Sequence, residues 1–239
     1  ATAIPVGTAI AQSFHVALAE SYGSIVGAEM ERFGVHLWLA PALNIHRDIR
    51  CGRNFEYFSV DPLISGKFAA ALTRGVQKHP GCGTTVKHYA ANNQEKNRYC
   101  NNSIVSERAM REIYLKGFGI CVKESQPHAL MTSYNLLNGL HTAEHRGLIE
   151  DILRCEYGYK GIVMTDWIIA MSMDKRSKHR MPIAAEIAKA GGDLVMPGCK
   201  DDYTSILNAV QDGSLDIGQL QINATRIYRK AKELCEKRQ

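Results

Sequence analysis

The residues best suited to chemistry in this chain are Asp166 and Trp167, which follow a short apolar run at 161–164. The run reads as a buried strand, and a strand core disfavours a carboxylate, so we expect Asp166 just past the strand, at the mouth of a pocket. A carboxylate there can attack carbon or balance a developing positive charge. The structural alternative is a helix N-cap, because Asp caps a helix well after a strand.

Polar side chains also follow three other strand-like runs, at 35–40, 84–87 and 130–133. The residues in the last part of these runs or after them that could meet a polyhydroxylated ligand are Asn44, His46, Arg47, Arg53, Glu56, Lys87, His88, Tyr89, Asn92, Asn93, Gln94, Glu95, Arg98, Met131, Thr132, Ser133, Tyr134 and Asn135. Most of these side chains can hydrogen-bond sugar hydroxyls, while Trp167 and Tyr134 offer apolar ring faces. A cation such as Lys87 or Arg53 would keep Asp166 ionised, as a nucleophile must be.

Several of these residues also have a structural interpretation. Lys87 and His88 could form a structural ion pair with Glu95 or Glu56. Arg53 could brace Glu56 and Asp61 within its own loop. Met131 could belong to the hydrophobic core, and Arg98 could be a surface charge. These alternatives stay open at the level of sequence.

Helix-like and strand-like segments alternate along the chain. The pattern predicts helices at 8–32, 61–78, 106–124, 145–156, 182–190, 203–211 and 217–236, and strands at 35–40, 84–87, 130–133, 161–164 and 193–196. Alternation with short connections implies parallel strands joined by right-handed crossovers. In a barrel of this kind, active sites lie where strands end and the following loops begin, which is where the polar residues occur.

The predicted fold is therefore α/β, a (β/α)₈-type (TIM-like) barrel, in a single domain that spans residues 1–239. A closed barrel needs eight strands and usually about 250 residues. The chain begins at Ala1 in helix-like sequence with no strand before it, so we expect a barrel without its first strand or strands. An open doubly wound sheet is the structural alternative.

Composition restricts the class of protein. The residues are 45% hydrophobic and 22% charged, as in ordinary globular domains. No apolar stretch approaches the roughly 20 residues of a membrane span, and the basic cluster at 175–180 lacks the aromatics of a nucleic-acid site. Seven scattered cysteines without a C-x-x-C pair predict free thiols in the cytoplasm. We expect no metal, since His141 and His145 lack a third ligand.

Six segments together resemble glycoside hydrolase family 3, in its β-glucosidase branch. They are CGRNFEYFS (51–59), KHY (87–89), NQE (93–95), VSER (105–108), MTSYNLLNG (131–139) and GIVMTDW (161–167), and the similarity runs from about residue 3 to about residue 200. The resemblance implies a (β/α)₈-type barrel whose nucleophile maps onto Asp166. The substrate-binding residues of the family map onto Arg53, Lys87, His88, Arg98, Met131 and Tyr134, with Trp167 beside the nucleophile.

The resemblance also implies an activity, the retaining hydrolysis of terminal β-D-glucosides by double displacement. Asp166 would attack the anomeric carbon and water would then release the sugar, with no cofactor. In this branch the general acid/base lies on a second, α/β-sandwich domain that is absent from this sequence. We therefore expect a small-molecule β-glycoside or oligosaccharide as substrate, no nucleic-acid or membrane partner, and a second domain or chain that completes the site.

Two other functions remain open at this point. The chain could be a non-catalytic sugar-binding or subunit protein, which keeps the polar pocket but needs a partner segment or chain to supply the acid/base. It could also be a Schiff-base lyase, because a barrel aldolase could carry its amine where Lys87 lies.

Overall fold

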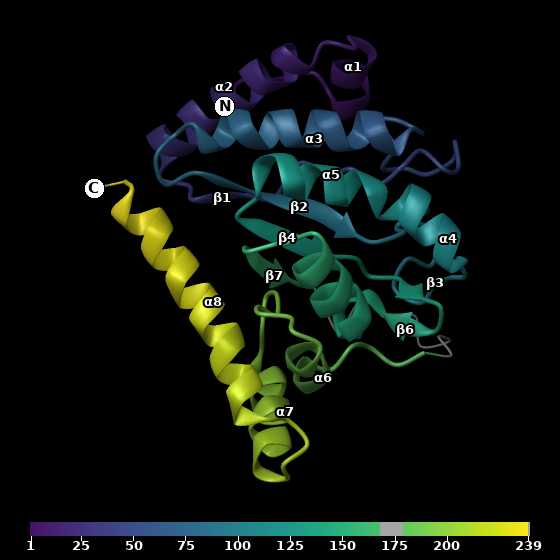
Figure 1. The fold of residues 1–239 in the computed structure, drawn as a ribbon, viewed down its shortest axis with the longest axis vertical. Coiled ribbons are helices and arrows are strands. Elements are labelled where there is room, and N and C mark those ends of the chain that lie inside the picture. The colour runs from purple at the N-terminus through teal and green to yellow at the C-terminus, as the bar shows by residue number, and fades with distance from the viewer. Residues whose placement is uncertain (168–178, 239) are drawn as a thin grey trace.

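A parallel sheet forms the centre of the computed structural model, which describes residues 1–167 and 179–238 (Figure 1). Its strands, in spatial order, are β1 (Leu37–Trp38), β2 (Gly83–Tyr89), β4 (Ala129–Thr132) and β7 (Ile162–Met164). A parallel bridge from Met164 to Leu194 adds the fifth predicted run beside β7. Neighbouring strands therefore follow chain order, as in a (β/α)₈ barrel. The predicted α/β class and strand order are confirmed, and the sheet is open within the described residues.

Helices cover one face of this sheet, with α2, α3 and α5 packed side by side above it in Figure 1. The helices are α1 (Gly7–Gln12), α2 (Val16–Phe33), α3 (Pro62–Gln77), α4 (Glu107–Ala109), a π-helical turn (Met110–Tyr114), α5 (Lys116–Ser125), a π-helix (Gly147–Glu156), α6 (Ala184–Lys189), α7 (Lys200–Gln211) and α8 (Ile217–Glu236). Each of β1, β2, β4 and β7 is followed by helical structure that returns the chain to the start of the next strand.

The predicted helix at 8–32 is wrong in one respect, because it is broken into α1 and α2. Phe14 has a φ of 50°, a left-handed conformation that ends the first helix. His15 then begins the second, since its Nδ1 accepts a hydrogen bond from the Leu18 N–H at 3.0 Å. Side-chain capping of this kind satisfies a backbone donor that the first turn of a helix leaves free.

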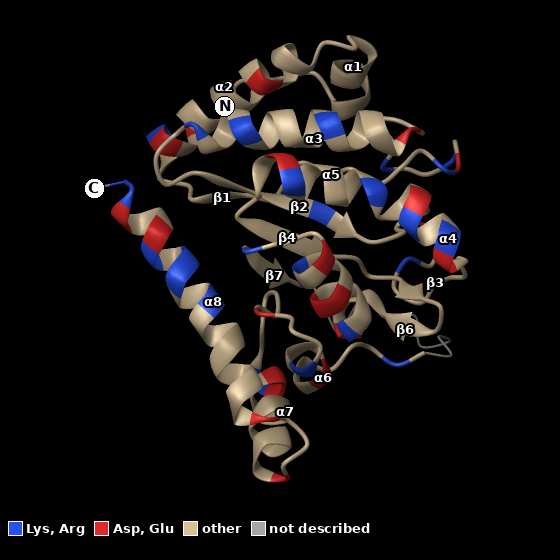
Figure 2. Ribbon diagram, in the orientation of Figure 1, with Lys and Arg blue, Asp and Glu red and all other residues tan. Residues whose placement is uncertain are grey.

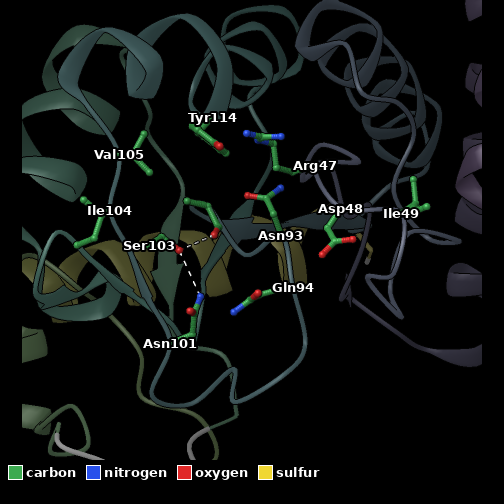
Figure 3. Close-up of a pocket in the computed structure, with 11 residues that line it drawn as sticks. Arg47, Asp48, Ile49, Asn93, Gln94, Asn101, Ser103, Ile104, Val105 and Tyr114 are labelled. Atoms are coloured by element: carbon green, nitrogen blue, oxygen red, sulfur yellow. Dashed lines mark hydrogen bonds between the residues drawn. The ribbon is translucent and has the colours of Figure 1, made fainter.

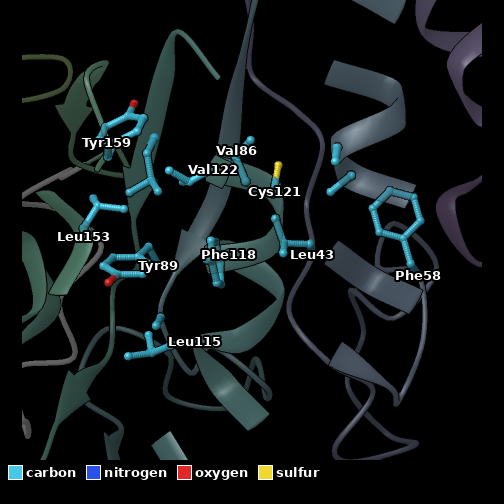
Figure 4. Close-up of a cluster of buried hydrophobic side chains, with 14 of the residues drawn as sticks. Leu43, Phe58, Val86, Tyr89, Leu115, Phe118, Cys121, Val122, Leu153 and Tyr159 are labelled. Atoms are coloured by element: carbon cyan, nitrogen blue, oxygen red, sulfur yellow. The ribbon is translucent and has the colours of Figure 1, made fainter. Parts of the chain in front are cut away.

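The main hydrophobic core lies between the sheet and the helices (Figure 4). Val86, Leu130 and Val163 point toward the helices from adjacent strands, and their neighbours in sequence point away, as the two-residue period of a strand requires. The rings of Tyr89 and Phe118 meet edge to face with centroids 5.0 Å apart. This layer fixes β2, β4 and β7 against α5, and so fixes the strand ends that carry the polar residues.

A second, smaller sheet was not predicted. It consists of β3 (Asn102–Ser103), β5 (Leu136–Leu137) and β6 (Leu140–His141), in that spatial order. Asn138 and Gly139 connect β5 to β6 with φ values of 50° and 93°. A two-residue type I′ hairpin needs positive φ at both positions, and Asn-Gly is its strongest sequence signal. The small sheet therefore had a readable signal, and it lies beside the site because β5 follows β4 closely.

Charged residues of both signs are interspersed over the described elements (Figure 2). Along α8, for example, Lys237 pairs with Glu233 and Lys232 with Glu236, which is not the one-sided basic stripe of a nucleic-acid site. The basic segment 175–180 lies outside the described residues except for His179 and Arg180. Among the described helices, none combines the length and the apolar character needed to cross a membrane.

Candidate active site

Asp166 lies just beyond β7, at the edge of the sheet where the parallel strands end. The residue is 9% exposed, and its Oδ1 accepts a hydrogen bond from the Trp167 N–H at 2.8 Å. Its Oδ2 is buried and has no hydrogen-bond partner among the described residues. Because residues 168–178 lie outside the description, the helix-capping alternative stays a prediction. A buried carboxylate oxygen with an unused lone pair is the feature that a nucleophile needs.

The strand that carries Asp166 is extended by contacts with the run around Leu194. Thr165 N donates to Leu194 O at 3.0 Å, and Thr165 Oγ1 accepts from Met196 N at 2.9 Å. These two bonds hold the residue next to Asp166 from both its backbone and its side chain. The position of the carboxylate is therefore set by strand pairing rather than by a free loop.

His88, at the end of β2, is the nearest basic group to this carboxylate in the described structure. Its Nε2 lies 3.6 Å from Asp166 Oδ2. Burial lowers the pKa of His88 well below its usual value, and the cations Arg53, Lys87 and Arg98 lower it further, so the imidazole is neutral at pH 7. His88 and Asp166 are therefore neighbours without forming an ion pair.

Asn44 holds His88 in place through its backbone. The Asn44 side chain accepts from the His88 N–H and donates to the His88 carbonyl, each at 2.8 Å, and both residues are buried. An amide is the side chain that can do both, because it carries a donor and an acceptor side by side. The sequence placed Asn44 at a strand end but gave no sign of this partner.

The pKa of Asp166 is raised from its usual value. Burial is the main cause, and the Trp167 N–H, the Tyr134 hydroxyl and the cations Arg53 and Lys87 oppose it. The two cations act in the predicted direction, since they favour the ionised carboxylate. Burial outweighs them in the net shift, so the pKa of Asp166 stays above its usual value, and the ionised nucleophile remains a prediction.

Arg53 and Lys87 converge on Glu56, which explains why their effect is limited. Arg53 Nε donates to Glu56 Oε1 at 2.5 Å, and Lys87 Nζ lies 3.8 Å from Glu56 Oε2. Burial lowers the pKa of Lys87, while the negative charges of Glu56 and Asp166 oppose that shift. The ion pairs of Arg53 and Lys87 with Glu56 are thus present, as the structural alternative predicts. The same two cations also lower the pKa of Asp166, so both interpretations apply to them. Glu56, one of the polar candidates predicted from the sequence, thus contacts both cations.

Arg98 is part of an aromatic cluster rather than an isolated surface charge. It donates to Glu95 Oε2 at 2.9 Å and to the Tyr99 hydroxyl at 3.0 Å, and its guanidinium lies 4.9 Å from the centre of the Tyr134 ring. The Tyr99 and Tyr134 rings are 4.6 Å apart, and the Tyr134 hydroxyl donates to the Trp167 carbonyl at 2.8 Å. A continuous set of contacts therefore joins Arg98 to the residue after the candidate nucleophile.

Met131 lies in β4 and is buried with Ala129, Ile162 and Met164 on the sheet face that points away from the covering helices. This placement fits the core interpretation, and a contact with sugar stays a prediction. Trp167, by contrast, is 42% exposed, and a contact of its ring with sugar also stays a prediction.

Two hollows near the strand ends differ greatly in size. Asp166 lines a cavity of about 10 Å³, whose other lining residues are Tyr99, Thr132, Ser133, Tyr134, Ala143, Thr165, Met181 and Pro182. The larger hollow, of about 630 Å³, lies between the segments 47–49, 93–94 and 101–105 and Tyr114 (Figure 3). It is lined by three of the polar candidates, Arg47, Asn93 and Gln94, but by none of the residues that the family resemblance predicts at the site, so volume alone does not identify the site. In the described part of the chain, no group of three or more His, Cys, Asp or Glu side chains is placed to hold a metal ion.

Comparisons with known sequences give a consistent result. Residues 1–230 match the family described as glycosyl hydrolase family 3 N terminal domain. Beta-glucosidase A of Butyrivibrio fibrisolvens is 46% identical over 237 residues, which are 98% of this chain and 27% of that protein. Beta-glucosidase B of Emericella nidulans is 42% identical over 198 residues, 83% of this chain and 22% of that protein. The chain thus spans about a quarter of the length of these relatives.

Solved structures agree with the sequence matches. Beta-glucosidase 3B from Thermotoga neapolitana, in complex with glycerol, is 40% identical with a TM-score of 0.89, over 99% of this chain and 33% of that one. The GH3 beta-glucosidase of Bifidobacterium adolescentis is 36% identical with a TM-score of 0.89, again over 99% and 33%. The barrel-type fold and the family resemblance are confirmed. This chain belongs to glycosyl hydrolase family 3, in the part that the family's N-terminal domain represents.

Proposed function

We propose that this chain supplies the nucleophile and most of the sugar-binding residues of a retaining β-glucosidase. The observation that carries the proposal is the buried, unpartnered Oδ2 of Asp166 at the carboxyl edge of the sheet. The names of the relatives, which are beta-glucosidases, support the reaction and the class of substrate.

The reaction that fits this carboxylate is double displacement. Asp166 Oδ2 attacks the anomeric carbon, and the bond to the leaving oxygen breaks with its electron pair on that oxygen. Water then attacks the same carbon, gives a proton to the acid/base, and releases the sugar and the free carboxylate. Oδ1 stays bonded to the Trp167 N–H, so the attacking oxygen keeps one orientation through both steps.

The sugar would lie across the mouth of the Asp166 cavity rather than inside it. A cavity of about 10 Å³ holds roughly one water molecule, which is far too little for a hexose. At that mouth the exposed ring of Trp167 can take the apolar face of the sugar. Lys87, Arg53 and Glu56 then offer charged hydrogen bonds to its hydroxyls, with Arg98 and Tyr134 as the neighbouring wall.

We also propose that another domain or chain supplies the general acid/base. This chain spans 22% to 33% of the relatives described above, so most of each relative lies outside the match. Without the acid/base, protonation of the leaving group is lost, which normally contributes about 10²–10⁴-fold to the rate. The isolated chain would then act as a sugar-binding fragment on ordinary glycosides, and it would react only where the leaving group departs without a proton.

Seven free thiols support our expectation of a cytoplasmic setting.

A reagent with an activated leaving group tests the nucleophile without the acid/base. We would incubate the chain with 2,4-dinitrophenyl 2-deoxy-2-fluoro-β-glucoside and measure the intact mass, followed by peptide mapping. The expected result is one fluoroglucosyl adduct on the peptide that contains Asp166, absent from Asp166→Asn. A folded chain that forms no adduct, or forms it elsewhere, would overturn the nucleophile assignment and favour the binding-only alternative.

A further inference from the structure

A buried glutamate, Glu144, follows Ala143, which lines the Asp166 cavity, and it binds the segment that forms one wall of that cavity. The Glu144 side chain is 2% exposed, and its two oxygens accept from Arg180 Nη1 at 2.7 Å and Arg180 Nη2 at 3.0 Å. Glu144 Oε1 also accepts from the Ile183 N–H at 2.7 Å. Paired two-point contacts of this kind fix both distance and orientation.

Two further bonds hold the same segment. His141 Nε2 donates to the Arg180 carbonyl at 2.6 Å, and Arg180 Nη1 donates to the Met181 carbonyl at 2.8 Å. A carbonyl oxygen can only accept, so the buried His141 ring must carry its proton on Nε2. Arg180 is thus held through its side chain and its backbone, and Ile183 through its N–H.

The residues between these anchors form the wall. Met181 and Pro182 line the cavity together with Asp166, and they lie between Arg180 and Ile183 in the chain. The turn that carries Glu144 is itself fixed, because Thr142 Oγ1 donates to Ser133 O at 2.6 Å. We call the contacts of Glu144 and His141 with Arg180 and Ile183 the clamp. The clamp connects this wall to the end of β4, on the side of the cavity that Ser133 lines.

We propose that Glu144 is a positioning residue of the active site. By holding Arg180 and Ile183, it sets the distance of Met181 and Pro182 from Asp166 and so determines which ligands fit at the nucleophile. Glu144 itself does not touch the reacting atoms. The inference rests on the proposed function of Asp166, but the clamp it describes can be measured separately.

The test compares two glutamates that differ in burial. Glu144→Gln keeps an oxygen for the Ile183 N–H but loses the charge pair with Arg180. The control, Glu112→Gln, removes the same charge from a pair with Arg108 in which the side chains are 60% and 84% exposed. Arg180→Gln is the second test variant, and since its side chain is half exposed it is expected to fold. Thermal unfolding of all variants checks that expectation.

The first readout is hydrogen exchange of the peptide that covers residues 179–183 in the unlabelled chain. We expect faster exchange there in Glu144→Gln and Arg180→Gln, and no change in Glu112→Gln. Unchanged exchange in both test variants would overturn the clamp, whatever the activity of the chain. This readout needs no substrate, so it stands even if Asp166 proves not to be the nucleophile.

The second readout is the rate of labelling by the 2-fluoro reagent as a function of its concentration. A displaced wall weakens binding of the reagent, so Glu144→Gln should raise its dissociation constant KI by roughly fivefold or more. The limiting rate constant should stay within about twofold, because the nucleophile is untouched. A double variant with Arg180→Gln should show no further increase, since both residues act through one contact.

The outcomes separate the two ideas. If the unaltered chain is labelled at Asp166 and KI is unchanged in both test variants, the positioning role is refuted and the proposed function stands. If the unaltered chain is folded but unlabelled, the proposed function fails, and the exchange result alone decides whether Glu144 holds the wall. Additive effects of the two substitutions on KI would also overturn the inference.

Discussion

The strand that leads to Asp166 depends on a buried carboxylate, Asp193, and removing that carboxylate should destabilise the fold strongly. Asp193 Oδ2 accepts from the Val163 N–H at 2.7 Å and from Arg154 Nη2 at 2.6 Å, while Oδ1 lies 3.4 Å from Arg226 Nη1. The Asp193 side chain is fully buried. Asp193→Asn keeps the size and an acceptor for Val163, but it removes the charge and puts an amide nitrogen in place of one of the two oxygens that face the arginines.

The expected loss in the free energy of unfolding is about 3 kcal/mol, at the lower end of the 3–5 kcal/mol typical of breaking a buried ion pair. Two observations place it there. Glu150 remains within 3.4 Å of Arg154 and 3.0 Å of Arg226, so neither guanidinium is left without a carboxylate. Burial also raises the pKa of Asp193 despite the two arginines, so the negative charge by itself contributes little to stability. The expected loss arises because the single oxygen of asparagine cannot restore the contacts with both Arg154 and Arg226, a loss that Asp166→Asn does not incur.

Urea denaturation at pH 7, followed by circular dichroism, measures this loss. With an m-value of about 2–3 kcal/mol/M, a loss of 3 kcal/mol lowers the midpoint by roughly 1–1.5 M. The matched control is Asp48→Asn, which breaks an ion pair with the exposed Arg50 and should leave the midpoint nearly unchanged. If Asp193→Asn shifts the midpoint no more than the control does, the network around Asp193 does not stabilise the strand as argued.

Three other substitutions address the site directly. Lys87→Ala should weaken glucose binding by roughly tenfold without unfolding the chain, and calorimetric titration that gives an unchanged affinity would leave Lys87 a structural residue. Asn44→Ala removes the side chain that pairs with the N–H and the carbonyl of His88. It should lower the free energy of unfolding by about 2–4 kcal/mol and slow labelling at Asp166. Equal stability of the variant and the unaltered chain in urea would contradict this. Asp166→Asn keeps the bond to Trp167 N–H but removes a buried charge whose folded pKa is raised. It should therefore raise the melting temperature at pH 7, and the gain should shrink as pH falls through the folded pKa, because both side chains are then neutral.

The sequence was sufficient to predict the sheet and the edge at which its polar residues meet. Short apolar runs alternating with amphipathic segments give β1, β2, β4 and β7 in chain order, and parallel strands end at one edge. Polar residues that follow different strands must then meet, which is why His88 and Asp166 lie 3.6 Å apart although 78 positions separate them in the printed sequence. The spacing of apolar residues predicts the strands and their ends because the backbone geometry of a strand or helix sets that spacing.

Specific side-chain partners could not be predicted in the same way. Asn44 reads as one more polar residue at a strand end, yet its amide pairs with the His88 backbone. The bond between Glu144 and Arg180 spans 36 positions, and no spacing rule connects a buried glutamate to an arginine at that distance. Such contacts depend on how several helices, strands and loops are placed relative to one another. The spacing of hydrophobic residues along the chain does not specify this placement.

The electrostatics of the site follow from one shared anion. Arg53 and Lys87 would together place two positive charges near Asp166, but Glu56 contacts both of them and offsets one. The neutral His88 adds no charge on the other side. Desolvation of Asp166 is therefore opposed by about one net cation, and its pKa stays raised. A ligand whose hydroxyls hydrogen-bond Glu56 would weaken its hold on Arg53 and Lys87 and expose Asp166 to more of their field. Substrate binding and ionisation of Asp166 would then favour each other, which is the coupling that the proposed retaining mechanism needs at its first step.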